Sequence, residues 1–366
     1  MAIWEAWKKV GNRSGQIVWI NCAKFTAMLA VLVDHTNGVL YTDQNIAVAS
    51  YFSVALFILL SGMTSYMANN NRRNISGGGI RSCKKIILAY CIAVAVYLGV
   101  LTKGFDLSLY LYHLTNFNIS GPHYFVLLYI QLMACNKILF RLLEICPESP
   151  RSCFFEGIIF AGILAFSSWT TRYTNILNVY GGGGKLFGGT YLVLYYLGML
   201  VQKHGWLRKW NIIKSAGMFA FFGSFWFLFW RYTCKNGYVL DQFVPFGQGN
   251  NPPSVTLSIA AICMLFACFG LFTLLEQTKY LFWVSLLAGM AGKHTLYIFL
   301  YHRLILDHFL LKYMADLPYE NIWLARVLFL GTMIIGSWLV ERLVEYMHDF
   351  LDTKKLEVKS VENQVF

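Results

Sequence analysis

The chain has 366 residues and is 57% hydrophobic but only 13% charged, whereas a soluble domain carries about 25% charged residues. This composition excludes a conventional soluble fold. The net charge of +12 raises the question of nucleic acid, yet no polar region carries a basic stripe interleaved with stacking aromatics. We therefore expect no nucleic-acid partner, and the 30 Lys and Arg residues need another explanation.

Ten apolar segments approach the length of about 20 residues that a helix needs to cross a membrane. We predict spans over 17–35, 47–68, 86–102, 123–141, 153–170, 188–202, 212–230, 255–275, 294–311 and 322–344. The segment 280–292 is too short to cross alone and is expected to be interfacial or re-entrant. The sequence thus predicts an all-α, polytopic membrane protein with one transmembrane domain, 17–345, between an N-terminal segment, 1–16, and a polar tail, 346–366.

The distribution of basic residues predicts the orientation of these spans. When alternate loops are assigned to opposite sides, 21 Lys and Arg residues fall on one side and 6 on the other. Because cytoplasmic loops are enriched in Lys and Arg, both terminal segments are predicted to be cytoplasmic. Most of the nine cysteines lie in spans or cytoplasmic segments and form no CxxC pair, so neither disulfides nor a metal site is expected.

The first predicted span carries Lys24, Asp34 and His35 among apolar residues. Ionisable groups at membrane depth are costly and normally face a protein interior or an aqueous cavity. Lys24 and His35 are 11 residues apart, which puts them nearly on one helix face with a rise of about 16 Å. That face would suit a thioester whose phosphates bind near the cytoplasm and whose carbonyl lies near a base. Alternatively, Asp34 and His35 are interfacial and Lys24 only snorkels.

A second cluster, Arg81, Lys84 and Lys85, precedes the third predicted span, and Tyr90 follows within it. Fixed cations at a cytoplasmic helix start suit a nucleotide phosphate, because Arg offers a bidentate fork and Lys a point charge. Topology alone or anionic membrane lipids would produce the same cluster, and these explanations are favoured when the cluster is considered by itself.

Five strings occur in one order along the predicted spans. They are WINCAKFTAMLAVLVDHT with Trp19, Lys24 and His35; LFILLSG with Phe57, Ser61 and Gly62; RSCKKIILAY with Arg81, Lys84, Lys85 and Tyr90; GPHYFVLLY with Tyr124 and Phe125; and GKHTLYIFLYH with Gly292, Lys293, Thr295, Tyr297 and His302. Together they resemble the acyltransferase 3 family of integral membrane O-acyltransferases over about residues 17–345. The chain departs from that pattern with Lys24 for Arg, Asn21 for Asp, Leu88 for Pro and Tyr124 for Trp.

The resemblance implies transfer of an acyl group, most often acetyl, from cytoplasmic acyl-CoA to a hydroxyl of a cell-surface or lipid-linked carbohydrate. It implies a bacterial plasma membrane, and no permanently bound cofactor. His35 would be the general base, because imidazole titrates near neutral pH. The acyl-CoA donor would be bound by Lys24, Arg81, Lys84, Lys85 and Tyr90. The acceptor would be bound, or the site supported, by Asp34, Ser61, Tyr124 and His302. Direct transfer and an acyl-histidine intermediate both remain open.

The same residues indicate which side chains are expected to contact one another in the site. The predicted domain organisation indicates which other proteins the chain would need. Asp34 lies about 100° around the helix from His35, so a residue of another span is expected to orient the imidazole. His302 would position the acceptor or bond to another span, and Ser61 with Gly62 would serve catalysis or close helix packing. With no soluble domain expected, onward transfer would require a separate extracellular transferase, and a homo-oligomer is the other protein partner considered.

Two other functions compete with acyl transfer. A polysaccharide or glycolipid exporter would show paired broken helices and internal symmetry, and no convincing repeat is present. A ligand sensor or scaffold without turnover is the third possibility.

The glycines 181–184 with Lys185 lack the residues of a phosphate loop and are expected to form an external loop. The string from His302 to Asp307 puts those side chains about 140° apart on a helix, which disfavours a catalytic pair.

Overall fold

The computed structural model describes residues 18–71, 78–102, 104–145, 150–172, 190–207, 210–239, 252–310, 323–336, 338–343 and 346. Most of these residues are helical and none lies in a β-strand. The all-α, polytopic membrane fold predicted from the sequence is confirmed, with eight helices in the described part that are long and apolar enough to cross a membrane. The segments 1–16 and 181–185, and the tail apart from Tyr346, lie outside the described residues.

A helix occupies each of the ten predicted spans. In chain order these are α2 (Val18–His35), α4 (Ser53–Asn71), α5 (Gly78–Thr102), α7 (Tyr124–Ile145), α8 (Pro150–Arg172), α10 (Thr190–Lys203), α11 (Ile212–Asn236), α13 (Val255–Gln277), α15 (Thr295–Leu304) and the C-terminal span Trp323–Leu343. Helix α15 continues as a π-helix, η2 (Ile305–Leu310). Over their described residues, α10 and α15 with η2 are shorter than the eight candidate spans.

Three elements differ from or add to the predicted spans. The predicted span 47–68 is divided into α3 (Gln44–Ser50) and α4, because the chain turns at Tyr51 and Phe52. The short segment 280–292 forms α14 (Phe282–Lys293), which packs along α2. An additional helix, α6 (Leu107–Asn116), begins where the Asp106 carboxylate accepts hydrogen bonds from the backbone amides of its first turn.

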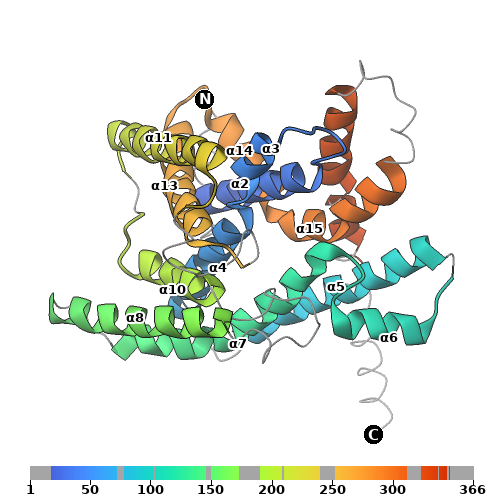
Figure 1. The fold of residues 1–366 in the computed structure, drawn as a ribbon, viewed down its shortest axis with the longest axis horizontal. Coiled ribbons are helices and arrows are strands. Elements are labelled where there is room, and N and C mark those ends of the chain that lie inside the picture. The colour runs from blue at the N-terminus through green and yellow to red at the C-terminus, as the bar shows by residue number, and fades with distance from the viewer. Residues whose placement is uncertain are drawn as a thin grey trace, which may run out of the picture.

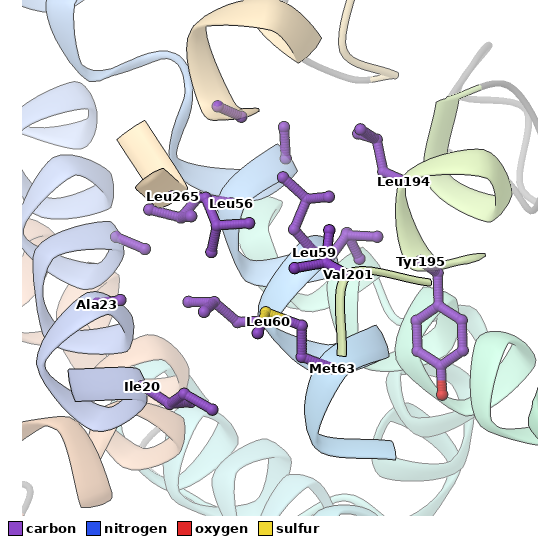
Figure 2. Packing of buried hydrophobic residues seen from close by; sticks show 14 of the residues in the cluster. Ile20, Ala23, Leu56, Leu59, Leu60, Met63, Leu194, Tyr195, Val201 and Leu265 are labelled. Carbon is purple, nitrogen blue, oxygen red and sulfur yellow. The ribbon is translucent and has the colours of Figure 1, made fainter. Parts of the chain in front are cut away.

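Helices α2 and α4 lie at the centre of the molecule, with α11 and α13 on one side and α15 on the other (Figure 1). Helix α10 crosses α4, α11 covers α13, and α15 contacts both α2 and α5. Figure 2 shows part of the buried core where Ile20 and Ala23 of α2 approach Leu56 and Leu60 of α4. A second buried cluster joins the later turns of α2 to α5, α15 and the C-terminal span.

Glycines allow the helix axes to approach closely in this core. A Cβ atom added at Gly62 would lie 1.9 Å from the Tyr195 carbonyl oxygen, and one added at Gly198 would lie 2.1 Å from the Leu59 carbonyl oxygen. The crossing of α4 and α10 therefore excludes any side chain at these two positions. Gly292 has the same function between α14 and α2, since its Cβ would lie 1.9 Å from the Asn21 carbonyl oxygen.

Candidate active site

A pocket of about 330 Å³ lies where α2, the α3–α4 turn, the start of α7 and α15 meet. Its polar walls come from Asp34, His35, Tyr51, Ser53, Tyr124 and Arg303, and its apolar walls from Val31, Val54, Gly121, Pro122 and Phe299. The volume is at the lower end of the range of about 300–1,000 Å³ typical of small-molecule sites. By the predicted topology, this pocket is at the outer end of α2.

Two histidines from different spans form the centre of the site. His35 ends α2 and His302 lies in α15, yet His35 Nδ1 is 2.6 Å from His302 Nε2. The rings are nearly parallel, with centroids 4.9 Å apart and an interplanar angle of 6°. His302 is fully buried, whereas the His35 side chain is 28% exposed. His35 is therefore the member of the pair that a ligand can reach.

The hydrogen bonds determine which nitrogen carries each proton. His302 Nδ1 lies 2.8 Å from the Phe299 carbonyl oxygen and 3.1 Å from that of Ile298, and a carbonyl can only accept. His302 Nδ1 is therefore protonated, so in the neutral ring Nε2 accepts a hydrogen bond from His35 Nδ1. The remaining nitrogen, His35 Nε2, has a free lone pair. The pocket is thus lined by an imidazole in the tautomer that a general base requires.

Two charged residues flank this imidazole. The Asp34 carboxylate lies 3.8 Å from His35 Nε2, a distance suited to an electrostatic contact or to a shared ligand hydroxyl. The Arg303 guanidinium donates to the His35 carbonyl oxygen at 3.4 Å and pairs with Asp307 at 3.1 Å. Among the described residues, Asp307 pairs with Arg303 and makes no hydrogen bond or ion pair with His302. A carboxylate, a base and a cation together line one pocket.

The other residues predicted to support the site lie at varying distances from this pocket. Tyr124 forms part of its wall. Ser61 is buried one helical turn below Phe57 and donates to the Phe57 carbonyl oxygen at 2.7 Å. Tyr90 is buried against α6, where its hydroxyl donates to the His113 carbonyl oxygen and its ring stacks on Phe117. The structure thus brings together Asp34, His35, Tyr124 and His302, and Ser61 and Tyr90 are not among the pocket-lining residues.

The predicted donor-binding cations lie on α2 and on the first turns of α5. Lys24 is half-buried, and no hydrogen-bond or ion-pair partner contacts it among the described residues. Lys84 and Lys85 are exposed on α5, which begins earlier than predicted and so includes them and Arg81 in its first two turns. The side chain of Arg81 lies outside the described ones. Lys85 Nζ is 3.6 Å from a carboxylate oxygen of Glu341 in the C-terminal span.

Several residues that line or shape the site have no role predicted from the sequence. Arg303 follows His302 within the predicted span 294–311, and an ionisable residue at that position is itself a signal of function. Tyr51 and Ser53 reach the pocket because the chain turns between α3 and α4, and no local pattern indicated that turn. His123, in a 3-10 turn, η1 (Gly121–His123), is fully buried and donates to the Leu300 carbonyl oxygen at 3.1 Å.

Fold and pocket define a multi-pass helical membrane protein with a histidine pair in a cavity between its spans. A family model described as an acyltransferase domain matches residues 17–342, which is most of the chain. The chain therefore belongs to the acyltransferase 3 family and is a membrane acyltransferase. Comparison with curated proteins and with solved structures found no match.

Proposed function

We propose that the protein transfers an acyl group, with acetyl as the preferred one, from acyl-CoA to a carbohydrate hydroxyl, with His35 as the general base. The observation that carries this proposal is the fixed tautomer of His35. Its Nδ1 proton is held by His302, so Nε2 has a lone pair in a pocket wall. A hydroxyl needs such a base, because at neutral pH it is a weak nucleophile until its proton is removed.

The transfer step uses groups that line the pocket. His35 Nε2 takes the proton of the acceptor hydroxyl while its oxygen attacks the thioester carbonyl carbon. The carbon–sulfur bond then breaks, and the imidazolium returns the proton to the leaving thiolate, which gives free CoA and an O-acyl ester. Arg303 would stabilise the negative charge that develops on the carbonyl oxygen. Asp34 would orient the acceptor hydroxyl and balance the charge of the imidazolium.

The pocket walls support a sugar as the acceptor. Tyr51, Tyr124 and Phe299 offer aromatic surfaces, and Asp34 with Ser53 offers hydrogen-bonding groups beside them. This mixture of apolar walls and a few polar groups is typical of sites for small polar molecules. By the predicted topology the pocket is at the outer side, where cell-surface carbohydrate occurs. A bacterial plasma membrane is the location that fits this acceptor.

Donor binding would use cations on the predicted cytoplasmic side. Lys24 is on the same helix as His35 and about 16 Å of helix rise away from it, roughly the reach of an extended pantetheine arm. The CoA phosphates would bind Lys84, Lys85 and Arg81 at the start of α5, with Lys24 deeper in the bundle. Because the α5 cations are on the predicted cytoplasmic side and the pocket is on the predicted outer side, the donor would extend through the domain, past Lys24, to reach His35.

A purified-protein assay tests this proposal. Protein in detergent is mixed with acetyl-CoA and a panel of nitrophenyl glycosides, and CoA release and acetylated sugar are measured together. We expect His35→Ala to lower the rate by about 100-fold or more, the usual contribution of a general base. His113→Ala is the matched control, because the His113 imidazole bonds to Asn118 at the exposed end of α6 and does not line the pocket.

Two results would contradict the proposal. Transfer at the wild-type rate by His35→Ala would remove His35 from the mechanism. Absence of CoA release with every acceptor, together with absence of acetyl-CoA binding, would favour export instead.

A further inference from the structure

The turn of α15 that carries His302 has an unusual backbone. Helix α15 changes to a π-helix at Ile305, three residues after His302. Short π-helical turns next to α-helices are rare and occur frequently at functional sites. Just before this change, the hydroxyl of Tyr97, a buried residue of α5, lies between the two backbone groups of an i→i−4 pair of α15 (Figure 1 shows α5 and α15).

The Tyr97 hydroxyl bridges two backbone groups of that turn. It donates to the Leu300 carbonyl oxygen at 3.1 Å and accepts from the Leu304 amide at 3.0 Å. The Leu300 carbonyl also accepts from His123 Nε2 at 3.1 Å. Because a carbonyl oxygen has two lone pairs, these two side chains satisfy it. Tyr97 thus provides the Leu304 amide with a side-chain acceptor.

His302 lies between the two bridged residues. Its Nδ1 bonds to the Phe299 and Ile298 carbonyl oxygens of the same turn, and its Nε2 accepts from His35. Any change in the conformation of residues 300–304 therefore moves the imidazole that fixes the His35 tautomer. Arg303, which lines the pocket, lies on the same turn.

We propose that Tyr97 is a positioning residue for the transfer reaction, since its hydroxyl holds the α15 turn in the conformation that aligns His302 with His35. Without that hydroxyl the Leu304 amide would turn to the Leu300 carbonyl oxygen, and the turn would approach regular α-helical geometry. The inference rests on the proposed function for its effect on rate. Its structural part, the position of His302, can be measured without any activity.

The test compares two Tyr→Phe variants that each lose one hydroxyl bonded to backbone. Tyr97→Phe loses the bridge in α15, whereas Tyr110→Phe loses contacts to Cys91 between α6 and α5, among them a 3.3 Å bond to its carbonyl oxygen. We expect Tyr97→Phe to lower kcat by 10-fold to 100-fold with an unchanged KM for acetyl-CoA. Tyr110→Phe should keep the wild-type kcat. Thermal unfolding of both variants checks that they remain folded.

A double-mutant cycle separates positioning from a general loss of structure. If Tyr97 acts through His302, adding Tyr97→Phe to His302→Leu should lower kcat no further. Additive losses would mean that Tyr97 acts on another part of the molecule and would overturn the proposal.

Labelling with diethyl pyrocarbonate provides the readout that needs no activity. His302 is fully buried with both ring nitrogens hydrogen-bonded, so it should resist the reagent. We expect its labelling, located by peptide mass spectrometry, to be at least several-fold faster in Tyr97→Phe than in Tyr110→Phe. Equal labelling with equal kcat would overturn the positioning role. Full activity of His35→Ala would instead overturn the proposed function, and labelling would still decide the positioning role.

Discussion

The pocket histidines and the histidines at the predicted cytoplasmic ends have different partners. Glu156 at the start of α8 binds Lys203 with one carboxylate oxygen and His204 with the other, at 2.6 Å for His204. Glu341 does the same with Lys85 on one oxygen and His294 on the other. His35 has another imidazole as its hydrogen-bond partner, and its nearest carboxylate oxygen is 3.8 Å away.

This difference separates structural from chemical roles. A Lys–Glu–His cluster satisfies both oxygens of a carboxylate with cationic or proton-donating partners from the same protein. The imidazole pair uses the Nδ1 proton of His35 and leaves its Nε2 available to a ligand. We therefore expect changes in the Glu156 cluster to alter stability and changes in the His302 contact to alter the rate.

The largest expected effect is on stability, at Glu156. The Glu156 and Lys203 side chains are each 8% exposed, and Lys203 Nζ also donates to the Leu143 carbonyl oxygen at 2.8 Å. Replacing Glu156 by Leu removes the carboxylate that pairs with the buried Lys203 ammonium, which costs about 3 kcal/mol or more. Thermal unfolding in detergent should show this as a drop in Tm of several degrees, while kcat per folded molecule remains unchanged.

The paired change Glu156→Leu with Lys203→Leu is the control for this prediction. It removes both charges, so the Tm should recover part of the loss. A Tm unchanged by Glu156→Leu alone would show that the cluster does not hold α8, α7 and α10 together. A fall in kcat per folded molecule in Glu156→Leu would contradict the assignment of a purely structural role to the Glu156 cluster.

The next largest effect is on the rate, at His302. Replacing His302 by Leu removes the acceptor that fixes the Nδ1 proton of His35, and we expect kcat to fall by about 100-fold, within the contribution of a general base. His302→Gln keeps an oxygen near the position of Nε2 and should retain more activity than His302→Leu. The measurement is CoA release at saturating acetyl-CoA. Equal rates for Gln, Leu and wild type would show that His35 needs no partner.

How far the sequence could predict these features depends on the range of each interaction. The spans follow from apolar length, a local property, and the helices are found where they were predicted. The turn at Tyr51 was missed because NIAVASYFSV is apolar and compatible with a continuous helix. His35 and His302 were each candidates, but their contact joins residues 267 positions apart and has no local signal. The Lys85–Glu341 ion pair could not be predicted either, because it also joins residues that are far apart in the sequence.

The smallest expected effect concerns donor binding at Lys85, whose side chain is 59% exposed. Glu341 already holds this cation, so a CoA phosphate must compete with a carboxylate that belongs to the protein. Glu341→Gln frees Lys85 and keeps an amide oxygen for His294. We expect the KM for acetyl-CoA to fall by about twofold to threefold and Lys85→Gln to raise it by a similar factor, as exposed ion pairs contribute less than about 1 kcal/mol. Because salt screens exposed charges, both shifts should shrink in 0.5 M salt.

Lys279→Gln, on the same predicted side, controls for net charge and should leave KM unchanged. An unchanged KM in both Glu341→Gln and Lys85→Gln would assign the α5 cluster to lipid or topology, because only a bound anionic donor makes the two variants shift KM in opposite directions.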